Sequence, residues 1–526
     1  IPKTGRYGRP GMRELIPRID GLWNNEREKV YTSAEEIVQA FQKSTKQTEG
    51  EDLKPDILHD AYSRYTKNYD SRHGGFGSSP KFPSPHNLMY LLRYWRNSGE
   101  EKALEMVTHT LESMRMGGIF EQVGFGFHRY ATDAEWLVPH FEKMLYDQAM
   151  LTMAYTEAWQ ATGHEHFRET AQQVIQYVLR DLQDFRGAFY SAEDADSEGE
   201  EGKFYVWSTG EIRNILPQAD AELAIEVFNM EEEGNYQDEA SRRRTGKNIL
   251  HFSKSLQNLA EERELSVEEL ENKLSRIRDA LLKEREDRVR PFLDDKILTD
   301  WNGLMIAALT KAGRAFGEVG LIEEAQRAFN FINEQLTRED GKLLHRYREG
   351  EAAIDGHADD YAFLTWGLLE LYEATFEIDY LEKAIALNSI FIDNFWDPEH
   401  GGFFFSGKGS EELLGRKKEV YDGAIPSGNS AALLNLLRIG RITANTDLED
   451  KADQMMRLFS TQLKSAPTGF GQFLQGVHFA LSDSFEIIVA GGEGEKTTQE
   501  ILRLIHSNFV PDKVLILKKP DEDEKK

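Results

Sequence analysis

The chain has 526 residues, no cysteine and a formal net charge of −28. Its 40% of hydrophobic residues can bury a large core, whereas its acidic field disfavours nucleic acids and anionic membranes as partners. The lack of cysteine excludes disulfides, thiolate metal sites and thiol chemistry. The apolar runs are far shorter than the roughly 20 residues that a bilayer requires, and no signal segment opens the chain. We therefore expect a soluble, cytoplasmic protein.

The beginning of the chain combines a glycine-rich loop with amphipathic sequence up to about Lys43, and a polar linker follows at 44–54. From Ile57 onward the pattern changes to successive helices. Some of them carry clear start signals, such as the capping hydroxyl and proline of Ser84-Pro85. The predicted helices cover 57–69, 84–95, 101–115, 139–161, 167–185, 300–317, 321–337, 358–377, 380–395, 428–441 and 447–464.

A glycine followed by aromatic or apolar residues recurs between these helices. Most copies lie roughly 60–70 residues apart, which leaves room for two helices and a loop. Helical hairpins of this kind bury their faces by stacking on one another, and six of them can close into a ring. We therefore predict a mainly α fold, an (α/α)6 six-hairpin barrel over 55–480, with the very charged segment 231–290 as an insertion. The copies begin at Gly74, Gly117, Gly187, Gly341, Gly401 and Gly469.

The pattern changes again near the end of the chain. Phe485 to Ala490 and Val514 to Leu517 are apolar runs typical of strands, and 496–508 between them is helical. This order predicts a small β-α-β appendage over 481–526, which ends in a solvated tail from Asp521.

The densest polar block reads GFGFHRY and then WLVPHFEKMLYD. Pro139 suits the first position of a helix, so we expect His140 in the opening turn, where the helix dipole lowers the pKa of an imidazole. A neutral imidazole suits general acid–base catalysis, and His128 lies in a loop from which its ring can reach the same place. Asp147 shares the helix face of His140, while Glu142 points away. A His140 that only caps the helix is the alternative.

The second polar block, from Tyr190 to Gly202, is rich in carboxylates and is followed by Tyr205 and Trp207. Asp194 and Asp196 resemble the start of an EF-hand loop. However, Tyr205 stands where that loop needs a bidentate glutamate, so we predict no metal site. Carboxylates flanked by aromatic rings also suit sugar binding, and a solvated acidic loop is the alternative.

Further polar groups stand at the starts of later helices, in the strings DDKILTDWNGLM, HADDYAFL and YDGAIPSGNS. Each string taken singly is explained by helix capping. In a ring, however, these helix entrances converge on one mouth, where several polar groups can share a pocket. The chain carries no HExxH, P-loop or GxSxG signature.

These strings, together with Lys81-Phe-Pro-Ser-Pro85 and FYSAEDADSEG, resemble the family of spermatogenesis-associated, thioredoxin-domain-containing proteins from about residue 1 to 520. The resemblance implies a thioredoxin-like domain before an (α/α)6 barrel similar to N-acylglucosamine epimerases and six-hairpin glycosidases. It implies that 1–43 is a remnant of that domain, whose cysteine motif is missing from this chain together with a cysteine-bearing tail. Two residues depart from the family pattern. Phe125 replaces a usual glycine and narrows the loop beside His128, and Asp300 adds a carboxylate where a small residue is usual.

We therefore predict a carbohydrate-active protein, similar to an epimerase or isomerase, that acts on a small sugar without a cofactor. His128 and His140 form the expected acid–base pair, and the other catalytic candidates are Asp194, Asp360 and Asp422. The alternatives are a glycosidase with paired carboxylates, and a non-catalytic sugar- or protein-binding module coupled to a redox domain. The sequence makes no prediction of oligomeric state. The residues expected to bind the sugar are Arg129, Tyr130, Glu142, Asp147, Asp196, Tyr205, Trp207, Trp301, Asn302, Tyr361, Ser427 and Asn429.

Overall fold

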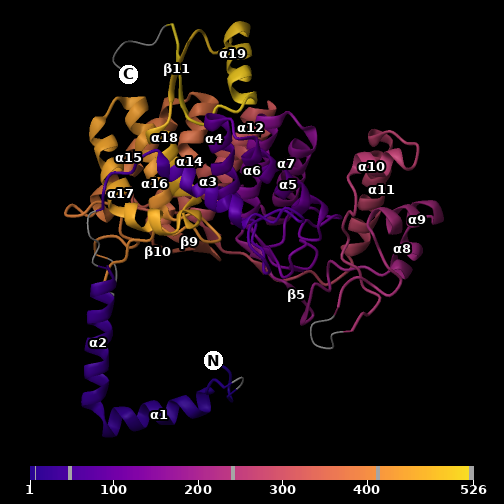
Figure 1. Cartoon of the computed structure of the whole chain (residues 1–526), viewed down its shortest axis with the longest axis horizontal. Coiled ribbons are helices and arrows are strands. Elements are labelled where there is room, and N and C mark those ends of the chain that lie inside the picture. The colour runs from indigo at the N-terminus through magenta and orange to yellow at the C-terminus, as the bar shows by residue number, and fades with distance from the viewer. Residues whose placement is uncertain (6–7, 46–49, 238–242, 410–414, 521–526) are drawn as a thin grey trace.

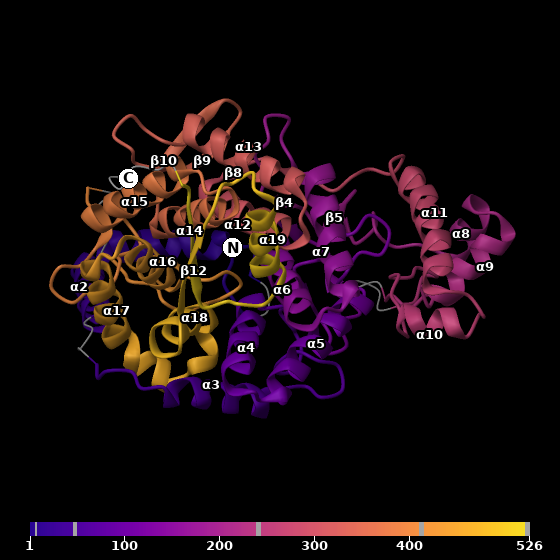
Figure 2. The same cartoon turned by 90° about the horizontal axis from the view of Figure 1, so that it is seen from above.

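Two concentric rings of helices form the body of the protein (Figures 1 and 2). The computed structural model describes residues 1–5, 8–45, 50–237, 243–409 and 415–520. Each inner helix contacts the next, and α18 contacts α4 to close the ring. The inner helices are α4 (Pro85–Ser98), α6 (Leu145–Thr162), α12 (Thr299–Phe316), α14 (Ala358–Thr375), α16 (Gly428–Thr443) and α18 (Gly471–Leu481). The outer helices are α3 (Asp56–Asn68), α5 (Glu101–Met116), α7 (Glu165–Tyr177), α13 (Val319–Gln335), α15 (Ile378–Phe395) and α17 (Thr446–Ser465). The predicted (α/α)6 barrel is confirmed.

The two rings differ in how their helices are buried. The inner helix α14 is buried on nearly all sides, and apolar residues occupy most of its positions after the first turn. The outer helix α7 buries only one stripe, with Phe167, Ala171 and Val174 at helical spacing. An apolar helix needs neighbours on every side, whereas an amphipathic one needs a partner on one side only. The sequences of the helices therefore sort them into the two rings.

The recurring glycine motif closes five of the six hairpins with a short backbone bridge, and after α17 the 3-10 helix η2 (Pro467–Gly469) stands in its place. Residue pairs such as Phe120 with Phe127 and Trp396 with Phe403 form isolated antiparallel bridges after the outer helices. The glycines just before the second partner, Gly126 and Gly402, have φ of 81° and 73°, a region that favours glycine. In the second repeat the left-handed glycine is therefore Gly126. The predicted Gly117 has φ of −68°.

An amide side chain from the next inner helix clamps this bridge in three of the repeats. The amide of Asn302 accepts a hydrogen bond from Phe189 N at 2.8 Å and donates one to Phe189 O at 3.0 Å. Asn429 clamps Phe403 in the same way, with both distances at 2.8 Å. Gln148 clamps Phe127 at 2.8 and 2.7 Å. These buried amides join the hairpin loops to the inner ring.

Two predicted helix boundaries are wrong. The helix expected at 139–161 begins at Leu145, because β2 (Pro139–His140) pairs with β1 (Tyr130–Ala131) and β3 (Lys143–Met144) pairs with β4 (Ala192–Glu193). The helix expected at 167–185 ends at Tyr177 and continues as the π-helix η1 (Val178–Leu182).

Helices α8–α11 form a lobe beside the ring (Figure 2). They are α8 (Thr209–Ile215), α9 (Gln218–Val227), α10 (Leu256–Glu261) and α11 (Val267–Arg285). The very charged segment 231–290, predicted as an insertion, supplies α10 and α11. Leu259, Leu270 and Leu274 join residues of α8 and α9 in a hydrophobic cluster distinct from that of the ring. Helical spacing of leucines supports this burial even in a charged sequence.

The two ends of the chain extend from opposite sides of the ring (Figure 1). At the C-terminal end, β11 (Phe485–Ala490) and β12 (Lys513–Lys518) pair in parallel, with α19 (Lys496–Ser507) between them in the chain. This is the predicted β-α-β unit. At the other end, α1 (Met12–Asn25) and α2 (Arg27–Thr45) form an arm, and α1 has no buried residue. Residues 46–49 of the predicted linker and the tail 521–526 lie outside the described residues.

Candidate functional site at the mouth of the barrel

The inner helices all begin on one side of the ring, because each is preceded by an outer helix that returns the chain to that side. The connecting strands β9 (Leu344–Arg348) and β10 (Glu351–Asp355) lie on this side, opposite β11 and α19 (Figure 1). The predicted convergence of helix entrances therefore forms a mouth. Helix N-termini also place the positive ends of their dipoles there, which favours carboxylates.

Asp360 is the centre of the mouth and is 0% exposed. It accepts hydrogen bonds from Asp300 N at 3.0 Å, from His357 N at 2.7 Å and from His345 Nδ1 at 3.0 Å. Asp360 was predicted to touch the substrate, but its oxygens are committed to the starts of α12 and α14 and to one imidazole. It holds other groups in place.

His345 and His357 lie against each other with ring centroids 4.9 Å apart. Burial lowers the pKa of both rings, but the hydrogen bond and charge of Asp360 raise the pKa of His345 to about 9. For His357 the burial dominates, and its pKa is below the usual value. One ring therefore favours the protonated form and its neighbour favours the neutral form. Such a separation is typical of acid–base pairs.

A cavity of about 330 Å³ opens in the same mouth. Asp359, Glu419, Tyr421 and Tyr146 line it. Burial and the charge of Asp360 raise the pKa of Asp359 to about 7, so this carboxyl can hold a proton near neutral pH. Trp301 packs edge-on against Tyr146 at 4.8 Å and is only partly buried, so the predicted Trp301 is at this mouth.

The environment of His140 differs from the prediction. His140 belongs to strand β2, and its Nδ1 and Nε2 lie 2.7 Å from Glu201 and 3.1 Å from Glu142. The hydrogen bond to Glu201 raises the pKa of His140, so the expectation of a lowered pKa is wrong. Glu142, expected to point away, is a partner and also pairs with Arg129 at 2.9 Å. The predicted partner Asp147 forms no hydrogen bond with His140.

His128 and Asp147 are both buried, with 1% and 4% exposure. His128 Nδ1 lies 2.9 Å from Phe141 O, and burial lowers the pKa of the ring far below its usual range. Burial likewise raises the pKa of the Asp147 carboxyl far above its usual range. Neither side chain is open to a substrate here, so His128 and His140 do not form the accessible imidazole pair that we expected.

Several predicted site residues support the scaffold. Asp422 is 4% exposed and accepts hydrogen bonds from Ser427 N at 2.9 Å and Gln472 N at 2.8 Å, so it caps α16 and α18. Ser427 is the N-cap of α16. The Tyr361 hydroxyl accepts a hydrogen bond from Leu343 N at 3.0 Å, while Asn302 and Asn429 are the clamps described above.

The predicted acidic loop lies apart from this cavity. Asp194 and Asp196 are exposed, and Asp196 pairs with Glu201 in the hairpin of β5 (Asp196–Ser197) and β6 (Glu200–Glu201). Tyr205 and Trp207 are buried at 5% and 0% exposure, so their faces cannot stack on a sugar. Tyr130, in contrast, stacks on Phe82 with centroids 4.9 Å apart and adjoins His140.

Two groups of side chains have donor atoms close enough for a metal ion among the described residues. One is His345, His357 and Asp360 in the mouth, and the other is Glu112, His164 and His166 on the outer surface. In the first group, the carboxylate already accepts hydrogen bonds from two backbone amides and an imidazole. That geometry suits a proton-transfer site better than a metal site.

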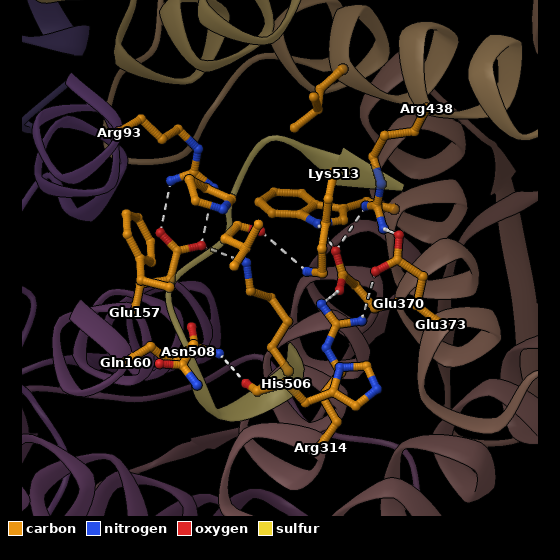
Figure 3. A pocket seen from close by; sticks show the side chains of 16 residues that line it. Arg93, Glu157, Gln160, Arg314, Glu370, Glu373, Arg438, His506, Asn508 and Lys513 are labelled. Atoms are coloured by element: carbon orange, nitrogen blue, oxygen red, sulfur yellow. Dashed lines mark hydrogen bonds and ion pairs between the residues drawn. The ribbon is translucent and has the colours of Figure 1, made fainter. Parts of the chain in front are cut away.

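The opposite end of the barrel is filled with ion pairs (Figure 3). Arg93 bonds Glu157 at 2.7 and 3.1 Å, and Arg438 bonds Glu370 and Glu373 at 2.8 Å each. The loop between α19 and β12 covers this network, and Gln160 donates to His506 O at 2.5 Å. The remaining cavity measures about 50 Å³. Cations are favoured here because the inner helices end on this side.

Sequence reasoning missed six groups of the mouth: Tyr146, His345, His357, Asp359, Glu419 and Tyr421. His357 and Asp359 stand in a string that it did single out, beside Asp360. His345 carries no such signal, because it follows an apolar pair in a strand rather than a helix start. Its importance comes from Asp360, which is distant in the chain.

No family model matches the chain. Spermatogenesis-associated protein 20 of Homo sapiens is 33% identical over 556 residues, which cover 98% of this chain and 70% of the human protein. Uncharacterized protein B0495.5 of Caenorhabditis elegans is 30% identical over 552 residues, covering 99% and 75%. Among solved structures, cellobiose 2-epimerase from Bacillus thermoamylovorans B4167 aligns with a TM-score of 0.51 at 11% identity, covering 77% of this chain and 87% of that chain. This likeness identifies the fold. No described helix is both long and apolar enough to cross a membrane.

Proposed function

Since this chain belongs to the spermatogenesis-associated protein 20 family and folds as the same kind of barrel as a cellobiose 2-epimerase, we propose that it is a carbohydrate-active enzyme. The reaction is proton transfer on a small open-chain sugar at the mouth of the barrel. The observation that carries this proposal is the pair His345 and His357, whose pKa values are shifted in opposite directions. Both contact Asp360, and the adjacent residue Asp359 lines the cavity of about 330 Å³. Fold likeness alone is a weak argument for function.

The two imidazoles can divide the chemistry between them. Neutral His357 takes the proton from the carbon next to the sugar carbonyl and leaves an enediolate. Because the two rings lie together on one side, the enediolate turns over before protonated His345 returns a proton to its opposite face. The bond to hydrogen breaks on one face and forms on the other, so the sugar is epimerised with no net change in composition. The two rings then exchange protons with water. Asp360 positions His345 through its hydrogen bond of 3.0 Å.

The cavity offers the groups that a sugar requires. Tyr146, Tyr421 and the partly buried Trp301 present aromatic surface at the mouth, which suits the apolar face of a sugar. Asp359 and Glu419 offer carboxylates for hydroxyl groups. We propose these sugar-binding roles for the residues that line the cavity.

A second candidate function rests on Asp359 and Glu419, which line one cavity. A carboxyl with a pKa of about 7 can act as a general acid, and a second carboxylate in the same cavity can act as base or nucleophile. This arrangement supports glycoside hydrolysis, in which water cleaves the bond between two sugars.

One experiment separates the two reactions. The whole chain is incubated in D2O with a panel of aldoses, ketoses and reducing disaccharides, and NMR follows both deuterium uptake at C2 and release of new reducing ends. Epimerisation predicts deuterium uptake that falls about 10²–10⁴-fold in His345→Gln and His357→Gln but persists in Asp359→Asn. Hydrolysis predicts new reducing ends that disappear in Asp359→Asn and Glu419→Gln.

His400→Gln is the matched control, since His400 also lies beside an aspartate, at 3.4 Å from Asp397, but neither residue lines the cavity. It should retain full activity. Thermal unfolding of each variant shows whether the ring is intact. Absence of both deuterium uptake and new reducing ends with every sugar would contradict the proposal, as would uptake that survives in both histidine variants.

A further inference from the structure

A second cavity, of about 290 Å³, lies where the lobe joins the ring. Four arginines line it, namely Arg180, Arg285, Arg288 and Arg290, together with only two acidic residues. Such a concentration of guanidinium groups is unexpected in a chain with a net charge of −28. Guanidinium groups are the preferred partners of phosphate and carboxylate, which they bind with two parallel hydrogen bonds.

The buried carboxylates around this cavity are already paired. Asp181 contacts both Arg180 and Arg290, the latter at 2.8 Å. Behind the cavity, Glu193 bonds Arg290 at 2.6 Å and Glu121 lies 2.9 Å from Arg285. Each guanidinium has five N–H donors, so even Arg290, which pairs with two carboxylates, keeps donors available. The carboxylates therefore hold the arginines in position.

Arg285 supplies an independent sign of a ligand. Its side chain is 4% exposed, and its Nε has no hydrogen-bond partner among the described residues. A buried donor without a partner is costly, and a ligand that brings an acceptor removes that cost. The guanidinium packs over Phe204, 4.9 Å from the ring centroid, and Phe204 also lines the cavity. The cavity thus combines cationic donors with an apolar wall.

The local backbone is built around these arginines. Arg180 and Asp181 belong to the π-helix η1. This conformation is rare in proteins as a whole, but where it occurs it is often found at a functional site. A Cβ added to Gly124 would lie 2.1 Å from Arg285 Nη2 and 3.1 Å from Arg180 Nη2, so only glycine lets both guanidinium groups approach. Gly124 is the first residue of the GFGFHRY string, and it has no role in the proposed site at the mouth of the barrel.

From these observations we propose that the cavity bounded by Arg180, Arg285 and Arg290 is a second binding site, for a small molecule that carries a phosphate or carboxylate group. It goes beyond the proposed sugar chemistry and is independent of it. By contrast, the ion-paired cavity at the far end of the barrel is only about 50 Å³, which leaves little room beyond the pairs themselves.

Calorimetry with the whole chain at low salt tests the proposal. The probes are inorganic phosphate, glucose 6-phosphate and citrate, with neutral glucose for comparison. We expect at least one anionic probe to bind more tightly than about 5 mM and to weaken as salt rises. A preference for glucose 6-phosphate over citrate identifies a phosphate ester, and the reverse order identifies a carboxylate. Because no turnover is measured, the result is separate from the proposed function.

Two variants with matched controls locate the site. Arg180→Gln should weaken binding about tenfold, whereas Arg168→Gln should not, although Arg168 is equally exposed, pairs with Glu318 and packs on an aromatic ring. Glu286 is an exposed acidic residue at the rim, so Glu286→Gln should tighten binding about fivefold. Glu268→Gln, exposed in the first turn of α11 and far from the lining, should have no effect.

Glu286→Gln removes only an exposed charge, so it keeps the test valid even where Arg180→Gln fails to fold. The proposal is overturned where none of the anionic probes binds the unaltered chain. It is also overturned where binding is the same in Glu286→Gln, or in folded Arg180→Gln, as in the unaltered chain, because the anion then lies elsewhere.

Discussion

At the scale of single residues, Asp360 is the side chain on which most groups of the mouth depend. Asp360→Asn replaces one acceptor oxygen by a donor and removes the charge beside His345. We expect the free energy of unfolding to fall by about 2 kcal/mol, as for a lost hydrogen bond to a charged group. Urea denaturation measures this change.

The neighbouring Asp359→Asn is the control for Asp360→Asn. The pKa of Asp359 is raised to about 7, so an asparagine resembles its protonated form, and it can still accept the hydrogen bond from Gly428 N. We expect a change in stability below about 0.5 kcal/mol. Equal losses in the two variants would contradict the central role of Asp360.

His345 makes the stability of the fold depend on pH. Its pKa is raised from 6.5 to about 9, so the folded state binds the proton more tightly than the unfolded state. The stability from this group is complete below about pH 6.5 and is lost as the pH rises through about 9. We expect the difference in melting temperature between pH 6.5 and 9 to be smaller in His345→Gln. An unchanged difference would show that Asp360 does not hold the imidazolium.

The candidate site could be predicted only in part, and the reason lies at this scale. Helix starts such as that of α14 are visible in the sequence, so Asp360 and Asp422 were found, but an N-cap and a catalytic carboxylate use the same residue type. Which of them faces a cavity depends on packing between distant hairpins. His140 was misplaced because β2 forms through pairing with β1, which outweighs a local helix start signal.

At the scale of elements, the amide clamps join the inner ring to the hairpin loops. Asn302→Ala leaves the buried N–H and C=O of Phe189 without partners. We expect the free energy of unfolding to fall by about 3 kcal/mol, with a similar loss for Asn429→Ala. Asn394→Ala is the control, because it removes a single bond to Ile390 O from an outer helix. Its loss should stay below about 1 kcal/mol. Equal losses of stability in Asn302→Ala and Asn394→Ala would contradict the proposed contribution of the clamps.

The element scale is also where prediction from sequence succeeded best. The recurrence of glycine before an aromatic residue reports a local backbone requirement, and its spacing reports the length of a hairpin. Both are properties of short segments, so they can be predicted from a single sequence. Two of the predicted glycines, Gly117 and Gly469, do not take the left-handed conformation, and in the second repeat Gly126 takes it instead.

At the scale of the whole molecule, the ring and the lobe have separate hydrophobic clusters. Leu274→Ala in α11 should lower the stability of the lobe by about 2–5 kcal/mol. We expect faster amide hydrogen exchange in α8–α11 and unchanged exchange in the inner helices. Leu309→Ala in α12, a comparably buried leucine, should instead raise exchange through the ring. Faster exchange of the whole ring in Leu274→Ala would show that the two clusters unfold together.

The ion pairs at the far end of the barrel make it a blind pit rather than a tunnel. Arg93, Glu157 and Arg438 stand across the axis of the ring, and the loop that follows α19 seals it. Any molecule that reaches the mouth must leave by the way it came. A long polysaccharide cannot pass through the closed barrel, so only the end of a sugar polymer could enter the mouth. Substrate and product therefore use the same opening.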